Sequence, residues 1–465
     1  MAQQSNNVDV IIIGGGVVGC AAFRRFTLMG ARTLLLEKGG DILSGASKAN
    51  SAILHTGFDA PPDSLELDCM QAGYREYVDI HTKMNLPLLK TGAIVVAWNE
   101  EQLAELPAIV HQAHQNGVTD VRQINASEVY QREKNLASGA LGGVWVPGES
   151  VIDPWSAPLA YMTQAVKHGG QYRFNCEVQA ATFVDDGWRL STSDGEYRAK
   201  LVINCAGNYG DLIDGLWRHP EFQIKPRKGQ FLVFDKPAAE KIEAIILPVP
   251  TPTTKGVLLS KTIFGNLLLG PTAEEQPERD KAEVNETVLH QLVEKGQRIL
   301  PALTDYSVTA TYAGLRPATE KKAYRIFDYP ENQWITVGGI RSTGLTAALG
   351  IAAHLETLYR ERFPALFALA PPAELTWPQM PMLSEYSARD YTCAGNGGIV
   401  CHCELVTRRE IEAAFDSAVP PECIGGLRRR TRVMMGRCNG FFCSNNVAEI
   451  INGRFENTLV TGKVT

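Results

Sequence analysis

The sequence predicts a mixed α/β protein in which a parallel βαβ fold is interleaved with a second strand-rich region and followed by a small cysteine-rich module. Three observations support this prediction. Residues 8–60 alternate strand, glycine turn and helix, as a βαβ unit does. An apolar strand at Leu201–Gly207 again ends on a glycine, which indicates that the chain returns to the first fold. Six of the ten cysteines fall between Cys393 and Cys443.

Length and composition favour a small-molecule enzyme of two or three domains. The chain has 465 residues, of which 45% are hydrophobic, so it can bury more than one core. Its charged fraction of 21% and net charge of -6 give no reason to expect a nucleic-acid partner. The polar segment Met1–Asn7 is unlike a signal peptide, and no run reaches the roughly 18 apolar residues of a membrane span. We therefore expect a cytoplasmic protein without structural disulfides.

The first glycine turn has the spacing of a dinucleotide site. Residues Gly14–Gly19 satisfy GxGxxG directly after the apolar strand Val8–Ile13. In this pattern Gly14 permits the tight turn, Gly16 lets backbone amides approach a pyrophosphate, and Gly19 allows the helix to pack closely on the strand. The alternative is a glycine turn that merely connects two elements.

A carboxylate follows the next strand at the position that a ribose requires. The strand Arg32–Leu36 ends in Glu37, which can accept hydrogen bonds from the adenosine hydroxyls. The positive end of the preceding helix would face the phosphates. Strand, helix and carboxylate in register therefore favour a nucleotide site over a plain turn.

Two later segments favour FAD over NAD. Ile203–Tyr209 resembles the second flavin-contacting strand and turn of flavoproteins with two dinucleotide-binding domains. Val337–Thr346 resembles their C-terminal flavin segment, whose helix would direct its positive end toward the flavin pyrimidine. The alternative is a glycine-rich loop followed by a core helix. Three matches in the expected order favour FAD.

At this point the chain resembles the D-amino-acid-oxidase and glycine-oxidase type of FAD-dependent oxidoreductase. Within that type it is similar to the branch of glycerol-3-phosphate and L-2-hydroxyglutarate dehydrogenases. The resemblance covers about residues 8–360 and rests on these segments: Asn50–Gly57, Ile224–Gly229, Leu247–Pro250, Gly270–Thr272 and Tyr312–Pro317. It implies a Rossmann-like FAD-binding domain with an interleaved mixed-sheet substrate domain.

The resemblance also implies domain boundaries and cofactor contacts. We expect the FAD-binding domain at 8–75, 150–215 and 325–362, the substrate domain at 76–149 and 216–324, a proline-rich linker at 363–397, and the cysteine module at 398–455. The residues expected to contact FAD are Gly14, Gly16, Val18, Gly19, Glu37, Lys38, Asn50, Ser51, His55, Val178, Ala206, Gly207, Gly339, Gly344, Leu345 and Thr346.

Family members oxidise a CH–OH or CH–NH bond by passing hydride to the flavin, which requires a base for the departing proton. His55 is the candidate base or flavin-orienting residue, and a satisfied structural histidine is the alternative. Arg316, with Lys255 as a weaker helper, is expected to bind the substrate carboxylate or phosphate. Phe58–Ala60 stands where many glycerol-3-phosphate enzymes of the family have an arginine, which weakens the case for a phosphorylated substrate.

The C-terminal cysteines have ligand spacing. Cys401 and Cys403 form C-x-C, and Cys438 and Cys443 form C-x4-C. Four thiolates can hold a [2Fe-2S] cluster or a Zn²⁺ ion, and C-x-C is uncommon in zinc ribbons. The module resembles the bacterioferritin-associated-ferredoxin-like [2Fe-2S] domain that ends the catalytic subunit of anaerobic glycerol-3-phosphate dehydrogenases.

Other residues of the module receive weaker assignments. Cys393 and Cys423 lie outside the ligand pattern and are interpreted as spare thiols, whereas His402 could tune the cluster or replace a cysteine. The basic run Leu427–Val433 is part of the resemblance. We expect it to form a solvated helix face that also offsets the charge of the cluster, rather than a nucleic-acid site.

A cluster beside a flavin suggests that electrons leave one at a time. The leading hypothesis is a catalytic subunit that oxidises a small anionic hydroxy compound, with sn-glycerol 3-phosphate first. L-2-hydroxyglutarate or another 2-hydroxy acid is second, and an amine or amino acid is third. A non-catalytic electron-transfer subunit is the hypothesis from another class. Each of these hypotheses implies a redox subunit or quinone-linked acceptor, and an oligomer or hetero-complex. Any association with a membrane would be through that partner.

Overall fold

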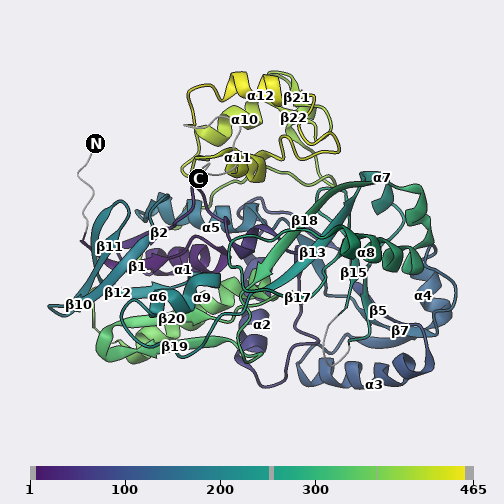
Figure 1. Ribbon diagram of the computed structural model, residues 1–465, viewed down its shortest axis with the longest axis horizontal. Helices are drawn as coiled ribbons and strands as arrows, with labels where there is room; N and C mark the ends of the chain where they lie inside the picture. Colours follow the sequence, from purple (N-terminus) through teal and green to yellow (C-terminus); the bar gives the residue numbers. More distant parts are fainter. Residues whose placement is uncertain (1–6, 251–255, 364, 456–465) are drawn as a thin grey trace.

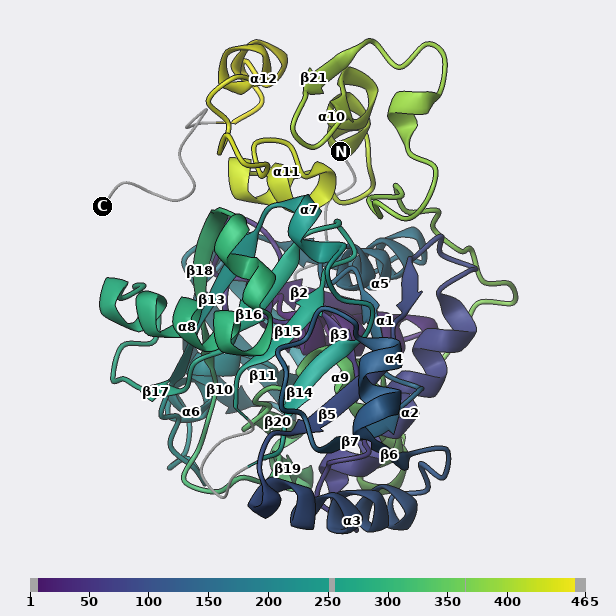
Figure 2. The same cartoon turned by 90° about the vertical axis from the view of Figure 1, so that its right-hand side faces the viewer.

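The computed structural model describes residues 7–250, 256–363 and 365–455. Two sheets lie side by side in the body of the molecule, and the small C-terminal module rests on top of both (Figures 1 and 2). The predicted mixed α/β class with a separate terminal module is thus confirmed. No helix within the described ranges is long and apolar enough to cross a lipid bilayer.

The first sheet has eight strands and takes them from three separated stretches of the chain. The strands are β1 (Asn7–Ile13), β2 (Thr33–Leu36), β9 (Gln171–Arg173), β10 (Val178–Val184), β11 (Gly187–Thr192), β12 (Gly195–Asn204), β19 (Arg325–Tyr329) and β20 (Trp334–Gly338). Their main order is β10-β11-β12-β1-β2-β9, with β20 joining β12 to β19. β12 lies parallel to β1, so the chain returns to the first fold as the strand before Gly207 predicts.

Helices cover this sheet and fix its position by close contacts. They are α1 (Val17–Leu28), α2 (Leu65–Ile80), α5 (Ser156–Lys167), α6 (Gly210–Asp214) and α9 (Gly344–Arg362). α2 and α9 cross at two glycines, since a Cβ on Gly73 would lie 2.1 Å from the Thr346 carbonyl oxygen and one on Gly350 would lie 2.0 Å from that of Cys69. Only glycine permits this approach, which holds the start of α9 in place.

The second sheet has nine strands and is mostly antiparallel. Its strands are β5 (Ala93–Ala97), β6 (Arg122–Asn125), β7 (Gly142–Val146), β13 (Arg227–Phe234), β14 (Ile245–Pro248), β15 (Leu258–Lys261), β16 (Leu267–Gly270), β17 (Glu274–Glu275) and β18 (Val308–Arg316). The helices beside it are α3 (Glu100–Gln115), α4 (Ala126–Arg132), α7 (Lys236–Ala239) and α8 (Glu286–Ile299). A small sheet of β3 (Ile53–Leu54), β8 (Ser150–Ile152) and β4 (Leu88–Lys90) completes the body.

Among the described residues of the predicted linker, 365–397 have no regular structure beyond a short 3-10 turn at Asp390–Thr392, as the prolines predict. This segment nevertheless packs on the body instead of hanging free. Met380 donates its backbone N–H to the Met84 carbonyl oxygen at 3.0 Å, and Glu385 donates to that of Ile263 at 2.9 Å. The segment therefore carries the chain along a defined path to the module.

The terminal module has a core of its own. It contains β21 (Ile399–Cys401), β22 (Val406–Thr407), α10 (Arg408–Phe415), α11 (Ile424–Thr431) and α12 (Ser444–Ile450). Val406, Ile411, Leu427 and Val447 are fully buried at its centre. A capping box at the start of α10 pairs the Thr407 and Glu410 side chains with backbone N–H groups.

The prediction of a solvated basic helix face is wrong, because α11 lies at the contact between module and body (Figure 2). The Arg430 guanidinium donates to both carboxylate oxygens of Asp41, at 2.5 and 2.9 Å, and both side chains are buried. Arg429 donates to the Ile42 carbonyl oxygen at 3.0 Å. A Cβ on Gly426 would lie 1.6 Å from an Asp41 oxygen, so only glycine lets the helix approach this carboxylate. Arg429 and Arg430 of α11 therefore bind the module to the body instead of facing solvent.

Removing the negative partner should loosen the module. Asp41→Asn leaves Arg430 buried without a counter-charge, a change that typically costs about 3–5 kcal/mol. We expect faster hydrogen exchange in α11 and faster proteolysis between body and module. Asp79→Asn, which removes an exposed partner of Lys83, is the matched control. Equal protection of α11 in the two variants would contradict the docking role of Asp41.

Candidate functional site

A pocket of about 410 Å³ runs along the ends of β1, β2 and β12 and reaches β18 and the start of α9. It brings together residues that lie far apart in the chain, from Ile13 to Leu345. The predicted residues that line it are Gly14, Gly16, Val18, Glu37, Lys38, Asn50, Ser51, Val178, Ala206, Gly207, Arg316, Gly339, Gly344 and Leu345. Gly19, His55 and Thr346 are predicted residues outside its lining, and Lys255 lies outside the described residues.

The glycine turn explains why one predicted residue does not line the pocket. Gly14 has φ of +105°, and a Cβ there would lie 2.6 Å from the Cys205 carbonyl oxygen on β12. At Gly19 a Cβ would lie 1.9 Å from the Gly14 carbonyl oxygen. Gly19 therefore lets α1 pack against the turn, and the open space above Gly14 and Gly16 forms a backbone cradle that suits a pyrophosphate.

Glu37 is buried at the edge of this cradle. Its carboxylate accepts hydrogen bonds from the backbone N–H groups of Gly15 at 2.6 Å and Gly39 at 2.7 Å. Burial raises the pKa of Glu37, and these two N–H groups oppose the shift. Each oxygen has a further lone pair, so the side chain retains the capacity to accept from ribose hydroxyls.

His55 follows β3 and belongs to a buried network that includes a residue missed by the sequence analysis. Its backbone N–H donates to the Thr346 hydroxyl at 3.0 Å, which ties β3 to the start of α9. Its Nδ1 lies 2.7 Å from Glu149 Oε2. The fully buried Glu149 carboxylate also accepts from the backbone N–H and hydroxyl of Thr56, at 2.7 and 2.9 Å.

The Glu149 contact fixes the chemistry available to His55. A carboxylate accepts hydrogen bonds, so Nδ1 carries the proton and Nε2 is the nitrogen that can take one up. No local signal pointed to Glu149, because it lies 94 residues from His55, just before β8. The folded chain alone brings the two side chains together.

Arg316 ends β18 in a set of positive groups. Its guanidinium donates to the carbonyl oxygens of Arg227, Lys228 and Thr272, at 3.3, 3.1 and 2.7 Å. Burial, followed by the charges of Arg227 and Arg341, lowers the pKa of Arg316 to about 10. Arg341 also lines the pocket, and its own pKa is lowered by burial and by Arg227. Positive charge thus gathers at this end of the pocket, where an anion would be stabilised.

The four predicted cluster ligands form two pairs. The side chains of Cys401 and Cys443 interact with each other, and so do those of Cys403 and Cys438. All four are free thiols. Among the residues that the structure describes, no group of three or more His, Cys, Asp or Glu could hold a single metal ion. Charges also couple Cys401 to Cys403 and Cys438 to Cys443, so the four thiols lie together as the ligands of a [2Fe-2S] cluster do.

The loop between Cys438 and Cys443 directs backbone N–H groups at sulfur. Burial raises the pKa of Cys438, but N–H groups of Phe442, Gly440 and Phe441 and the Cys403 thiol outweigh it and lower the pKa overall. Such N–H groups stabilise a thiolate, the form that ligates iron.

The remaining thiols and His402 lie apart from these pairs. Cys423 is the N-cap of α11, where its sulfur accepts the Gly426 N–H at 3.4 Å, so it is a structural residue instead of a spare thiol. Cys393 and His402 are exposed.

Comparison with known proteins identifies the two parts of this arrangement. Residues 9–358 match the family model described as FAD dependent oxidoreductase. The chain belongs to this family. Residues 399–453 match the model of the BFD-like [2Fe-2S] binding domain. The glycine cradle and the paired cysteines fit the cofactors of these families, FAD and a [2Fe-2S] cluster.

The relatives of this FAD-dependent oxidoreductase agree in fold and in general chemistry. A protein from Caloramator mitchellensis named glycerol 3-phosphate dehydrogenase is 30% identical, over 95% of this chain and 93% of the relative. The glycerol 3-phosphate oxidase of Mycoplasma pneumoniae is 27% identical, over 74% of this chain and 92% of the relative. A solved structure of L-alpha-glycerophosphate oxidase from Mycoplasma pneumoniae with FAD bound superposes with a TM-score of 0.74 at 24% identity, covering 81% of this chain and 99% of that one. The predicted enzyme class, an oxidoreductase, is confirmed.

The cysteine pairs can be tested by spectroscopy. Cys403→Ser and Cys443→Ser each remove one member of a pair, so both variants should lose the broad visible bands and iron of a cluster and keep the flavin absorbance. Cys423→Ser, which changes the helix cap, should retain iron and is the matched control. Zinc without iron in the anaerobically purified parent protein would overturn the cluster assignment.

The Glu149 contact predicts a change in pH dependence. Glu149→Gln keeps the shape of the side chain but removes the negative charge that favours a protonated His55. We expect kcat/KM to fall about 100-fold and its acidic limb to move to lower pH. Glu133→Gln, a buried carboxylate that accepts from backbone N–H groups of Glu243 and Ala244, is the control. A loss of FAD with an unmoved pH profile would indicate that Glu149 is only structural.

Proposed function

We propose that this oxidoreductase is a catalytic subunit that oxidises the CH–OH group of a small anionic compound, with sn-glycerol 3-phosphate as the leading substrate. The observation that carries the proposal is the pair of arginines that line the pocket, Arg316 and Arg341, with the charge of Arg227 nearby. Partly buried cations that lie near other cations are stabilised when a phosphate or carboxylate enters. The name of the relative from Caloramator mitchellensis, matched along nearly the whole chain, supports the choice of substrate.

The proposed roles follow from the chemistry of each side chain. FAD, when bound, supplies the acceptor for two electrons. Arg316 binds the anionic group through Nη1, while its contacts with three backbone carbonyl oxygens hold the guanidinium in place and so fix the orientation of the substrate. His55, with Nδ1 held by Glu149, takes the hydroxyl proton on Nε2. Gly344 and Leu345 begin α9 at the pocket, where the positive helix end stabilises negative charge.

A 2-hydroxy acid such as L-2-hydroxyglutarate is the second candidate, and one observation favours it. Phe58 and Ala60 stand where an arginine is expected in many glycerol-3-phosphate enzymes, and both are buried in the core. The Asn116 amide donates to the carbonyl oxygens of Gly57 and Ala60 at 2.9 and 2.8 Å, which holds the segment in place. Each carboxylate of such an acid carries one negative charge, whereas a phosphate dianion places two on one group and so needs more cations around it. L-2-hydroxyglutarate dehydrogenase from Indibacter alkaliphilus is 29% identical over 57% of this chain.

An anaerobic substrate screen separates the candidates. We expect the flavin band to bleach with sn-glycerol 3-phosphate, more slowly or not at all with L-2-hydroxyglutarate, and not with L-amino acids. Arg316→Ala should lower kcat/KM about 10- to 100-fold, since one charge-assisted contact is lost. Arg298→Ala, a change at an exposed helical position, is the control. Absence of bleaching by any hydroxy compound would leave the non-catalytic electron-transfer subunit as the better hypothesis.

We propose further that electrons leave through the cluster to a protein partner that docks at Phe441 and Phe442. These side chains are 81% and 76% exposed and pack edge to face. They lie in the loop between two cluster ligands, Cys438 and Cys443, so a partner that covers them reaches the cluster directly. Adjacent exposed aromatic side chains are typical of an interaction site.

The double variant Phe441→Ser/Phe442→Ser tests this surface. Substrate should still bleach the flavin at the parent rate, whereas electron transfer to the native acceptor in a cell extract should fall about 10-fold or more. Leu212→Ser, another exposed apolar residue on the body, is the control. Unchanged transfer to the acceptor, or dissociation of a homodimer as the sole effect, would refute the docking proposal.

A further inference from the structure

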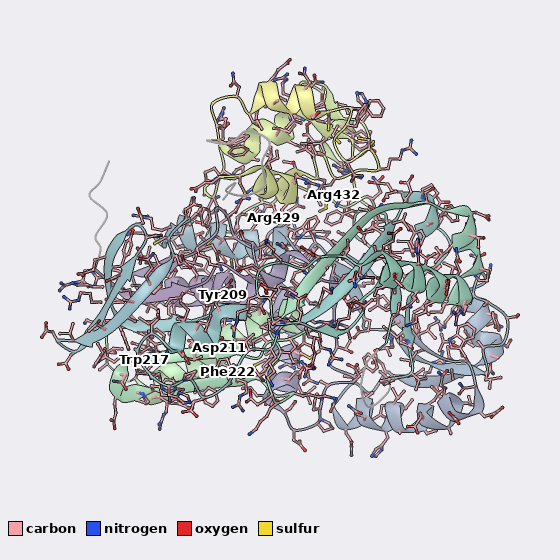
Figure 3. All side chains as sticks on the ribbon, in the orientation of Figure 1. Tyr209, Asp211, Trp217, Phe222, Arg429 and Arg432 are labelled. Carbon is pink, nitrogen blue, oxygen red and sulfur yellow. The ribbon has the colours of Figure 1, made fainter. Side chains whose placement is uncertain are left out.

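A second and larger cavity lies between the module and the body. It encloses about 1410 Å³ and shares part of its wall with the FAD pocket, along residues 48–51. On the body side it is bounded by Trp155 and by strands β13, β16 and β18, and on the module side by α11 and by Met435 and Asn439, which flank the ligand Cys438. Figure 3 shows Arg429 and Arg432 on the underside of the module, facing the body. The cavity thus adjoins the FAD pocket on one side, where Lys38, Ser44 and Glu177 also line both spaces, and the cysteine module on the other.

Positive charge dominates the lining. The cations are Lys38, Lys48, Arg428, Arg429, Arg432 and Arg454, and the carboxylates are Glu177 and Glu422. Two of the cations have counter-charges outside the lining, since Lys38 pairs with Asp280 and Arg432 with Glu404. The cavity therefore holds more positive charge than its own carboxylates neutralise.

Several of these cations have lost water on folding. Burial lowers the pKa of Lys48, and the charge of Arg429 lowers it further. Burial and Arg432 do the same to the pKa of Arg428. The Arg429 Nε is buried without a hydrogen-bond partner among the described residues. An anion in the cavity would offset this repulsion and desolvation.

Aromatic rings form a platform beside the cations. Trp155 and Phe264 stack with ring centroids 5.2 Å apart and planes 17° from parallel. The Arg432 guanidinium lies 4.1 Å above the Phe264 ring, and the Arg454 guanidinium lies 5.0 Å from the Phe415 ring. A flat ring can stack on such surfaces at little conformational cost.

We propose that this cavity binds a phosphorylated ligand with a planar aromatic ring, of the mononucleotide kind. Its phosphate is held by Arg428, Arg429 and Lys48, and its ring lies against Trp155, which Phe264 supports by stacking. The cavity volume exceeds that of most small-ligand pockets, so such a molecule fits beside a bound FAD. The site does not depend on which compound the enzyme oxidises. Because residues of module and body bind the same ligand, binding also stabilises the docked module.

The test uses the full-length protein with FAD and cluster bound. AMP, adenosine and inorganic phosphate are titrated by calorimetry, and the melting temperature is recorded with each. We expect AMP to bind at least about 10-fold more tightly than either fragment and to raise the melting temperature, since it alone combines ring and charge. Arg428→Gln and Arg429→Ala should each raise the AMP Kd about 10-fold, whereas Arg298→Ala should leave it unchanged. Flavin and iron contents verify that each variant is folded and loaded.

Three results would overturn the proposal. AMP that binds no more tightly than inorganic phosphate would indicate an adventitious ion only. AMP that binds solely to FAD-free protein, or displaces FAD, would place it in the FAD pocket. Equal AMP affinity in the parent, Arg428→Gln and Arg429→Ala proteins would exclude the cavity as the site.

Discussion

The buried ion pair between Asp41 and Arg430 joins the two redox parts of the molecule. Asp41 lies in the loop after Glu37, so the carboxylate that holds the module follows directly on the one that borders the FAD cradle. Its Oδ1 also accepts the Ile42 N–H at 2.7 Å, which keeps the loop in one conformation. A charge pair of this kind is stable only if both partners keep their geometry, because either alone would be buried without compensation. Movement of the module would therefore disturb the edge of the nucleotide site.

The same constraint explains the unusual exposure pattern of α11. Four arginines within Arg428–Arg432 would normally face water, yet Arg430 and Arg432 are buried and each pairs with a carboxylate. Gly426 gives the helix room to approach Asp41. The remaining charge faces the cavity beneath the module. α11 has its basic side toward the body. This one placement both holds the module on the body and makes the cavity positive.

The catalytic half has a comparable dependence on distant contacts. Thr346 at the start of α9 holds the His55 backbone, and Glu149 before β8 holds its ring. The glycine crossing of α2 and α9 places Thr346 where it can do so. Arg316 and the start of α9 line the same pocket, and the hydrogen bond from the His55 backbone to Thr346 fixes His55 beside that helix end.

The sequence by itself determined the features that depend on local pattern. The glycine spacing from Gly14 and the carboxylate at Glu37 predicted a dinucleotide, and the cysteine spacing predicted a [2Fe-2S] cluster or zinc, since each is a short motif whose chemistry is contained in neighbouring residues. The resemblance of two later segments to flavoproteins, and of the module to a [2Fe-2S] domain, then favoured FAD and the cluster. The sequence did not reveal Glu149, the Asp41–Arg430 pair, the capping role of Cys423 or the cavity under α11. The first two join residues far apart in the chain, and the burial of a charged helix depends on what covers it. Only the tertiary structure decides such contacts. A run of basic residues has the same sequence pattern whether it faces solvent or a carboxylate of another domain.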